Sequence, residues 1–240
     1  MELYVHGVAD PGPFLSARDC FETEFDLEHP VHVKLRDDPD ERTWAAHYDG
    51  YHILNVSKRT ASSALARELA IHEFAHMRRY EEGHASHLQS SREALYLALT
   101  EPNTDRNLTL HGLQIANHMK DIYADDLTLR VGPGDKLVSF LESSLASAVL
   151  EPDNAIGDAS SIIAVNAAFA LALCERHDLI DEDHRLYDLA HAAAYDAPDM
   201  PLVEFKQRFR SLTPDPTETE YRRELVGTIR SYARVHRAAK

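Results

Sequence analysis

The spacing of the apolar residues changes once along this chain, near Ser57, and that change separates a strand-forming part from a helix-forming part. Up to Val56 the apolar residues alternate in short runs, which is the period of a half-buried β-strand. Beyond Ser57 they recur three and four residues apart, as Leu65 and Leu69 do, which is the period of an amphipathic helix. We therefore expect an α+β fold, mostly α, in which a small N-terminal sheet is followed by a helical body.

Four short segments predict the strands of this sheet: Leu3–Val5, Val31–Leu35, Trp44–Tyr48 and Tyr51–Val56. The last two flank Asp49-Gly50, a dipeptide typical of a two-residue hairpin loop. Since Tyr51–Val56 ends just before the first long helix, we expect it to be an edge strand. An extended peptide could then bind by adding a further strand beside it.

The first long helix is predicted from about Thr60 to about Glu82, because Gly83 is a typical C-terminal cap. Further helices are predicted to start near Ser91, Leu108, Asp135, Ser160, Glu182, Leu202 and Thr217. No linker divides the chain, so we expect one domain over residues 1–240. A strand-rich part (1–57) would precede two groups of helices (58–150 and 151–240).

The charge of the chain restricts its partners. Asp and Glu number 40 against 25 Lys and Arg, which gives a formal net charge of −15, and acidic runs such as Asp181-Glu182-Asp183 add to the effect. Such a surface repels itself at low ionic strength and is tolerated where salt screens it, so we expect a halophilic protein. The same negative field argues against nucleic acid and anionic membranes as partners.

Three further features predict a soluble cytoplasmic protein without membrane insertion. The longest apolar run, Ile162–Cys174, is too short to span a bilayer and is interrupted by Asn166. The chain opens on Met1-Glu2 rather than on a basic and apolar leader. The two cysteines, Cys20 and Cys174, form neither a disulfide framework nor a cysteine-based zinc site.

One motif within the first long helix carries chemistry: His72-Glu73-Phe74-Ala75-His76. Residues i and i+4 lie one above the other on a helix, so His72 and His76 can offer two imidazole nitrogens to one metal ion. Glu73 lies one step around the helix, where it can act on a metal-bound water without being a ligand. We therefore predict a zinc site in which Glu73 is the general base.

A zinc site of this kind needs a third protein ligand. A local continuation of the motif would require Gly and His at positions that are occupied by Arg79 and Glu82. A predicted helical segment 45 residues beyond His76 instead places Asp121 and Asp125 on one face. We expect Asp121 to bind the metal and Asp125 to accept a hydrogen bond from the outer nitrogen of a ligand histidine.

The third position has three alternative occupants. His84 and His87 follow the end of the predicted helix and could fold back toward the motif. His118 lies in the same predicted helix as Asp121.

The two segments together resemble the gluzincin metallopeptidases of the HtpX and CAAX-protease kind. In that family His-Glu-x-x-His is followed by a helix with Glu-x-x-Ala-Asp, whose Glu is the third zinc ligand. This chain has Asp121-Ile122-Tyr123-Ala124-Asp125 there, and the resemblance covers residues 50 to 150. The chain is also similar to an uncharacterised family of haloarchaeal proteins with this motif pair.

Two departures from the gluzincin pattern matter. Asp121 is one methylene shorter than Glu, so the two helices must pack more closely for it to reach the metal. The membrane helices of many such proteases are absent, so their substrates do not carry over.

These observations predict a soluble zinc metalloendopeptidase with a peptide or protein as its substrate. Zinc held by His72, His76 and Asp121 would support hydrolysis with Glu73 as the base. The sequence does not single out a donor for the oxyanion among the chemically suitable side chains in later helices, which are His184, Tyr187, His191 and Arg208. The alternative is therefore a catalytically inactive zinc-containing regulatory or binding protein.

Overall fold

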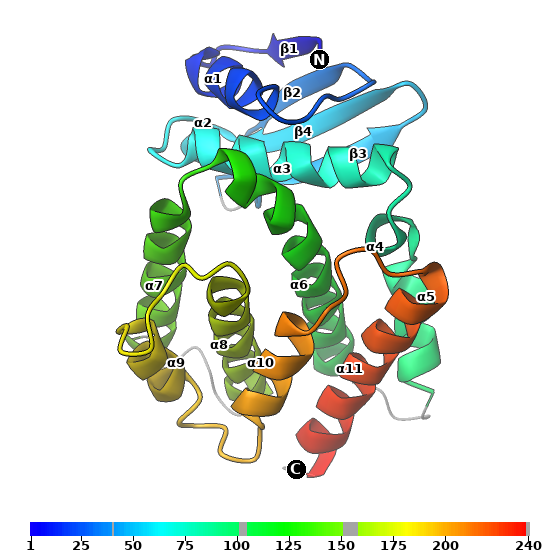
Figure 1. Cartoon of the computed structure of the whole chain (residues 1–240), viewed down its shortest axis with the longest axis vertical. Helices are drawn as coiled ribbons and strands as arrows, with labels where there is room; N and C mark the ends of the chain where they lie inside the picture. The colour runs from blue at the N-terminus through cyan, green and yellow to red at the C-terminus, as the bar shows by residue number, and fades with distance from the viewer. Residues whose placement is uncertain (40, 101–104, 151–157, 239–240) are drawn as a thin grey trace. The chain divides into compact units, whose positions relative to one another are not determined.

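The computed structural model describes residues 1–39, 41–100, 105–150 and 158–238 (Figure 1). A four-stranded N-terminal sheet is followed by helices, so the fold is α+β, mostly α, as expected. The chain forms two compact units: Met1–Leu88 with Tyr123–Gly132, and Gln89–Ile122 with Pro133–Lys240. The long helix α6 (Arg106–Val131) contributes to both units. The expectation of a single domain stays a prediction.

The sheet of the first unit contains β1 (Leu3–His6), β2 (Val31–Arg36), β3 (Trp44–Tyr48) and β4 (Tyr51–Ser57). Its strand order is β1-β2-β4-β3, in which β1, β2 and β4 are parallel and β3 is antiparallel to β4. The hairpin predicted at Asp49-Gly50 is present, and Gly50 adopts a φ of +80° there. That positive φ is the conformation for which glycine is preferred in such a loop.

The prediction that Tyr51–Val56 is an edge strand is wrong. Strand β4 pairs with β2 on one side and with β3 on the other, so its backbone is not available to an added peptide. The buried apolar residues Ile53, Leu54 and Val56 are typical of a central strand covered on both faces. The sheet edge beside β4 is β3.

A helix that the sequence analysis missed, α1 (Gly12–Phe21), connects β1 to β2. Parallel neighbours need such a crossover, because a tight turn can only join antiparallel strands. Phe14, Ala17 and Phe21 are its buried residues, at helical spacing. The segment Pro11-Gly12-Pro13 at its start has the composition of a turn, although proline is well tolerated in the first turn of a helix.

The helix predicted from Thr60 to Glu82 is two helices, α2 (Lys58–Ala61) and α3 (Ala66–Glu81). The side chain of Ser57 caps α2 by accepting the backbone N–H of Thr60. Beyond the end of α3, Gly83 has a φ of +66°, the left-handed conformation expected of a residue that follows a helix. The chain turns there into the short helix α4 (Ala85–Leu88).

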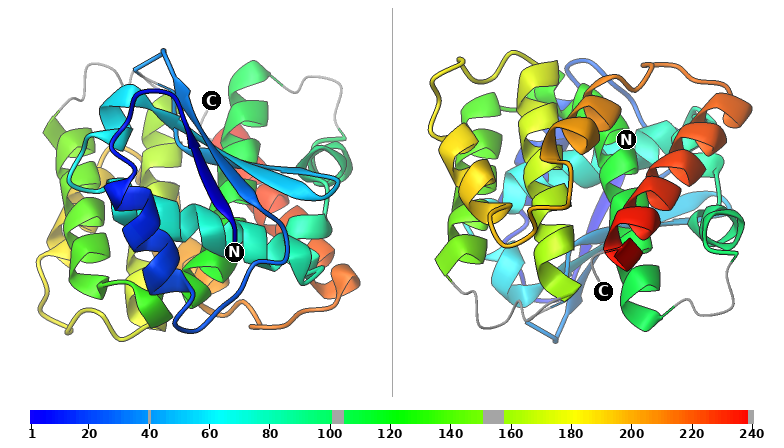
Figure 2. Two further views of the ribbon diagram at one scale, coloured as in Figure 1. Left: turned by 90° about the horizontal axis from the view of Figure 1, so that it is seen from above. Right: turned by 90° about the horizontal axis from the view of Figure 1, so that it is seen from below.

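The core of the first unit lies between the sheet and helices α1 and α3 (Figures 1 and 2). Helix α3 contributes Ile71, Phe74 and Met77 to this core, where they meet side chains of α1, β2 and β4. Ala124 and Leu127 of α6 belong to the same core. Helix α3 is therefore held by one face, and His72 and His76 remain half-buried on another.

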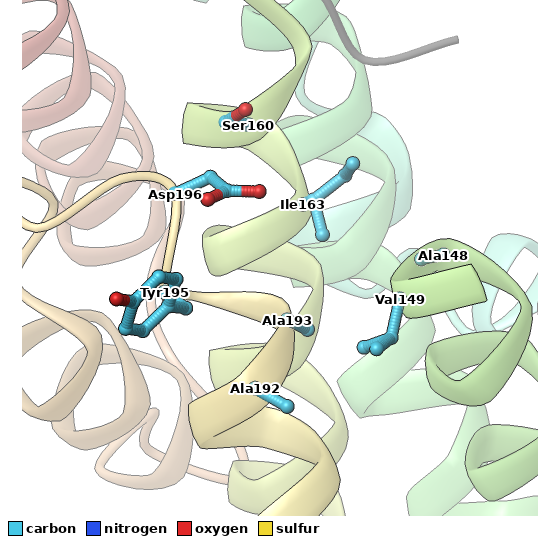
Figure 3. A pocket seen from close by; sticks show the side chains of 8 residues that line it. All are labelled: Ala148, Val149, Ser160, Ile163, Ala192, Ala193, Tyr195 and Asp196. Atoms are coloured by element: carbon cyan, nitrogen blue, oxygen red, sulfur yellow. The ribbon is translucent and has the colours of Figure 1, made fainter. Parts of the chain in front are cut away.

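The second unit is helical and contains α5 (Ser91–Ala98), α7 (Gly134–Leu150), α8 (Asp158–Arg176), α9 (Leu186–Ala193), α10 (Leu202–Arg210) and α11 (Glu218–Ala238). The predicted helices are all present, with the one expected near Glu182 beginning at Leu186. Helix α8 packs against α7, α9 and α10, and α11 packs against α5. A pocket of about 380 Å³ lies among α7, α8 and α9, with Tyr195 and Asp196 on its lining (Figure 3).

Helix α8 is also the one described helix that is long and apolar enough to cross a membrane, over Ala159–Arg176. This is weak support for a membrane span, since 61% of that window is buried. Such burial is typical of a core helix in a soluble protein.

Candidate metal centre

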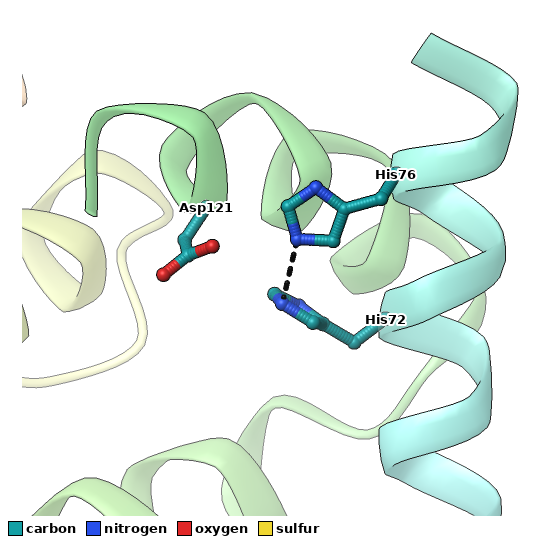
Figure 4. Close-up of side chains that lie close together, drawn as sticks. All are labelled: His72, His76 and Asp121. Atoms are coloured by element: carbon teal, nitrogen blue, oxygen red, sulfur yellow. Dashed lines mark hydrogen bonds between the residues drawn. The ribbon is translucent and has the colours of Figure 1, made fainter. Parts of the chain in front are cut away.

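Helix α3 brings the two motif histidines into direct contact (Figure 4). Their Nε2 atoms lie 3.0 Å apart, and the two rings are nearly perpendicular, at an interplanar angle of 83°. The spacing of four residues produces this arrangement, because it stacks the two side chains on one helix face. The two imidazoles thus point nitrogens at a common region of space.

Asp121 completes a group of three potential ligands. His72, His76 and Asp121 each offer one ligand atom, and these atoms all lie within 4.8 Å of one another (Figure 4). Helix α6 is continuous here, so Asp121 lies one turn before Asp125 on the same helix face. Among the residues that the structure describes, this is the one group of three His, Cys, Asp or Glu side chains with such geometry.

The structure also brings Asp125 to the outer nitrogen of a motif histidine, as the sequence predicts. Asp125 is buried, and its Oδ1 lies 2.7 Å from Nδ1 of His72. An ionised carboxylate only accepts hydrogen bonds, so Nδ1 of His72 is the donor. In a neutral His72 the proton is then on Nδ1, and Nε2 presents a lone pair toward His76.

The outer nitrogen of His76 has a different partner, His87, which the sequence analysis considered only as a ligand. Nδ1 of His76 lies 2.8 Å from Nε2 of His87. Nδ1 of His87 lies 2.8 Å from Oγ of Ser86, which in turn lies 2.7 Å from Nδ1 of His84. His84 and His87 therefore form a chain of contacts behind His76 and are not part of the three-residue group.

His118, the remaining alternative for the third position, contacts side chains of the second unit. Its Nε2 lies 2.9 Å from Oδ1 of Asn166, and its ring stacks on Phe169 with centroids 4.2 Å apart. Its Nδ1 lies 3.8 Å from Oδ2 of Asp121, which is longer than a hydrogen bond. His118 thus neighbours Asp121 without belonging to the three-residue group.

Glu73, the predicted general base, is largely buried, with 7% of its surface exposed. It directly follows His72 on α3. A buried carboxylate is stable only where hydrogen bonds or an opposite charge offset the loss of its hydration. Its placement is compatible with the predicted role, which stays a prediction.

Comparison with known proteins gives one match, which covers nearly the whole chain. Residues 1–234 match a family of unknown function, DUF5781. The chain belongs to this family. No curated protein and no solved structure matches it. This match does not test the resemblance to gluzincin metallopeptidases, which stays a prediction from the two sequence motifs.

The DUF5781 chain holds a second histidine pair that the sequence analysis missed. His47 and His52 face each other across the β3–β4 hairpin, with their Nδ1 atoms 3.1 Å apart. Nε2 of His52 lies 3.0 Å from Oε1 of Glu81, and that carboxylate also accepts the backbone N–H groups of Glu28 and His29. The pairing of His47 with His52 could have been read from a two-residue loop at Asp49-Gly50, whereas the contact with Glu81 is non-local.

Burial governs the charge of His52. Its side chain is fully buried, and this desolvation lowers its pKa below the ordinary histidine value, against the opposing effect of the Glu81 carboxylate. His52 is therefore neutral at pH 7. Because its Nε2–H is donated to Glu81, its Nδ1 accepts a hydrogen bond from the Nδ1–H of His47.

The chemically suitable oxyanion donors, His184, Tyr187, His191 and Arg208, all lie in the second unit, where three of them have local carboxylate partners. Tyr187 donates to Glu175 over 3.1 Å, and Nε of Arg208 lies 3.1 Å from a carboxylate oxygen of Glu204. Nε2 of His184 lies 3.9 Å from Glu142, and His191 is exposed.

Proposed function

We propose that this protein binds one zinc ion at His72, His76 and Asp121 and hydrolyses peptide bonds. The observation that carries the proposal is the orientation of the two imidazoles. Nδ1 of His72 faces the Asp125 carboxylate, and Nδ1 of His76 faces Nε2 of His87, so when both Nδ1 atoms carry the proton the two Nε2 lone pairs face each other at 3.0 Å. Two lone pairs at that separation repel unless a cation is shared between them.

The donor set fits zinc. Two nitrogens 3.0 Å apart can both lie about 2.0–2.1 Å from one ion, and a carboxylate oxygen is available from Asp121. Two imidazoles and one carboxylate make the three-protein-ligand set typical of catalytic zinc, which keeps one position for water or substrate. Zinc in such a site lowers the pKa of its water and polarises a carbonyl oxygen.

The chain's own residues supply the remaining chemistry in this proposal. Glu73 takes a proton from water and delivers it to the leaving amine. Asp125 and His87 hold the two imidazoles in the required tautomer. The pattern of these residues resembles that of gluzincin metallopeptidases, which favours an endopeptidase.

The edge strand β3 offers a binding surface for the substrate in place of β4. It is the outermost strand on its side of the sheet, and it packs against α3. The ring of His47 on β3 stacks on Tyr80 of α3 with centroids 4.2 Å apart, and Tyr80 lies one helical turn beyond His76. An extended peptide added beside β3 would therefore run close to the motif helix.

The proposal also covers the cellular location of the protein and its partners. We place it in the cytoplasm, with a peptide or protein as its partner and without nucleic acid or membrane insertion. The net charge of −15 supports this, because it disfavours anionic polymers and surfaces.

A second candidate function is zinc binding without turnover, in a regulatory or binding protein. It is favoured by the local pairing of Tyr187 and Arg208 with carboxylates in the second unit, which leaves the oxyanion donor unassigned. The same centre would then serve to stabilise the protein or to recognise a partner.

Zinc content and peptide cleavage should be measured together on the wild type, Glu73→Gln and the exposed control Glu82→Gln. We expect about one zinc per chain in all three. Cleavage of a fluorogenic peptide library should be abolished by a chelator, restored by zinc, and reduced about 10²–10⁴-fold in Glu73→Gln only. Zinc binding without cleavage in the wild type would support the second candidate, and absence of zinc would refute the centre.

A further inference from the structure

The strongest unassigned feature is the chain of contacts behind His76, formed by His87, Ser86 and His84. It lies wholly in the first unit and begins where Gly83 reverses the chain after α3. Ser86 is fully buried, and His84 is 7% exposed, so water has little access to its inner end. The ring of His84 also packs against Tyr123, with centroids 4.7 Å apart.

One backbone donor fixes the direction of every hydrogen bond that links His84, Ser86, His87 and His76. The backbone N–H of Ser86 points to Nδ1 of His84 over 3.3 Å, and a backbone N–H can only donate. Nδ1 of His84 therefore carries no proton. The hydroxyl of Ser86, 2.7 Å from the same nitrogen, must donate its single hydrogen there.

Two further hydrogen bonds connect the Ser86 hydroxyl to the candidate metal centre. Since the hydroxyl hydrogen of Ser86 is used, its oxygen accepts from Nδ1 of His87 over 2.8 Å. A neutral His87 then has a lone pair on Nε2, which accepts from Nδ1 of His76 over 2.8 Å. A neutral His76 accordingly keeps its lone pair on Nε2, the nitrogen that faces His72.

We propose that Ser86 and His84 are positioning residues for the candidate metal centre and act through His87 to select the tautomer of His76 that binds metal. The inference rests on the proposed zinc site and extends it by two residues, Ser86 and His84. Without the Ser86 hydroxyl, His87 is free to carry its proton on Nε2. It would then donate to His76, whose proton would move to Nε2 and block that nitrogen as a ligand.

The test compares Ser86→Ala, His87→Leu and His87→Gln with wild type and with Ser62→Ala, an exposed serine of the same unit. Glutamine offers an oxygen that accepts from His76, whereas leucine offers no acceptor. Zinc affinity is measured by competition with a chromophoric chelator. We expect losses of about 10–100-fold in Ser86→Ala and His87→Leu, partial or full recovery in His87→Gln, and no change in Ser62→Ala.

A second measurement separates this inference from the zinc proposal. Long-range ¹H–¹⁵N NMR spectra of histidine-labelled, metal-free protein report which ring nitrogen carries the proton. We expect the Nδ1–H tautomer of His76 in wild type and a shift toward Nε2–H in Ser86→Ala and His87→Leu. An Nε2–H tautomer in wild type, or unchanged tautomer and zinc affinity in both variants, would overturn the inference. Absence of zinc binding in wild type would refute the proposed function and the role of Ser86 and His84 in metal binding together. The spectra would still test whether Ser86 and His87 select the tautomer of His76.

Discussion

Two of the histidine pairs in the first unit, one on α3 and one across the β3–β4 hairpin, present ring nitrogens at nearly the same separation. His72 and His76 on α3 have Nε2 atoms 3.0 Å apart, and His47 and His52 across the hairpin have Nδ1 atoms 3.1 Å apart. In each pair one histidine donates its other N–H to a carboxylate, from Asp125 in the first and from Glu81 in the second. The two pairs are therefore alike in residue type, in the separation of the facing nitrogens and in having a carboxylate as one outer partner.

The pairs differ at the second histidine. His47 directs its N–H into the pair, where the lone pair of His52 accepts it, so the hairpin pair is satisfied without a cation. In the proposed arrangement, His76 donates its Nδ1–H to His87, so Nε2 of His76 presents its lone pair to that of His72. In the proposed arrangement, the partner of the outer nitrogen decides whether two close imidazoles form a hydrogen bond or a cation site.

The largest expected effect is on zinc content. His72→Ala and His76→Ala each remove one of the three proposed protein ligands, so the zinc content should fall from about one ion per chain to nearly none. His47→Ala and His52→Ala should keep about one ion per chain, because the hairpin pair is not the site. Elemental analysis after dialysis measures this, with circular dichroism to show that each variant is folded. Loss of zinc from a folded His47→Ala protein would break the comparison.

The next effect separates the two aspartates of α6. Asp121→Ala removes a proposed ligand and should largely strip the zinc, whereas Asp125→Ala removes a partner of His72 and should weaken binding about 10–100-fold. Asp125→Ala should therefore still fill at saturating zinc. Chelator competition gives both affinities. If Asp121→Ala binds zinc as tightly as wild type, another residue holds the third position.

The two carboxylates that accept from histidine should also differ in what they stabilise. Glu81→Ala leaves the buried Nε2–H of His52 and two backbone N–H groups without their acceptor, which should lower the free energy of unfolding by at least about 2 kcal/mol. Zinc affinity should change little. Urea unfolding of metal-free protein measures the loss, with the exposed Glu82→Ala as control. If Glu81→Ala instead lowered the zinc affinity and left the free energy of unfolding unchanged, Glu81 would support the α3 pair and not the hairpin pair.

Local patterns predicted the parts of the molecule that depend on neighbours in sequence. The period of the apolar residues predicted the strands and the helices beyond Ser57, the dipeptide Asp49-Gly50 predicted the hairpin, and a spacing of four placed His72 with His76 and Asp121 with Asp125. Non-local features were missed. The order of strands, which puts β4 inside the sheet, depends on the crossover through α1, and the partners of His76 depend on the chain reversal at Gly83. Neither leaves a periodic signature.

The smallest expected effect is a pH dependence that belongs to the hairpin pair. Burial lowers the pKa of His52 in the folded protein, while in the unfolded chain it titrates near the ordinary value of about 6.5. At pH values between the two, the unfolded state binds more protons, so the free energy of unfolding falls as the pH is lowered from about 7.5 through this window. A single site limits the slope to about 1.4 kcal/mol per pH unit.

His52→Gln removes the titrating group, so its unfolding free energy should vary less steeply with pH than that of wild type, even though the variant is less stable overall. The measurement is urea unfolding of metal-free protein from pH 5 to 8, and the difference between the two slopes isolates His52 from the other histidines that titrate in this range. Equal slopes would mean that His52 takes up a proton in the folded state as readily as in the unfolded one. The hairpin pair would then become charged as the pH falls below about 6.5, and protonated His52 would have a proton on Nδ1 to share with His47. The contrast with the α3 pair would have to rest on the hydrogen bonds among His76, His87, Ser86 and His84 alone.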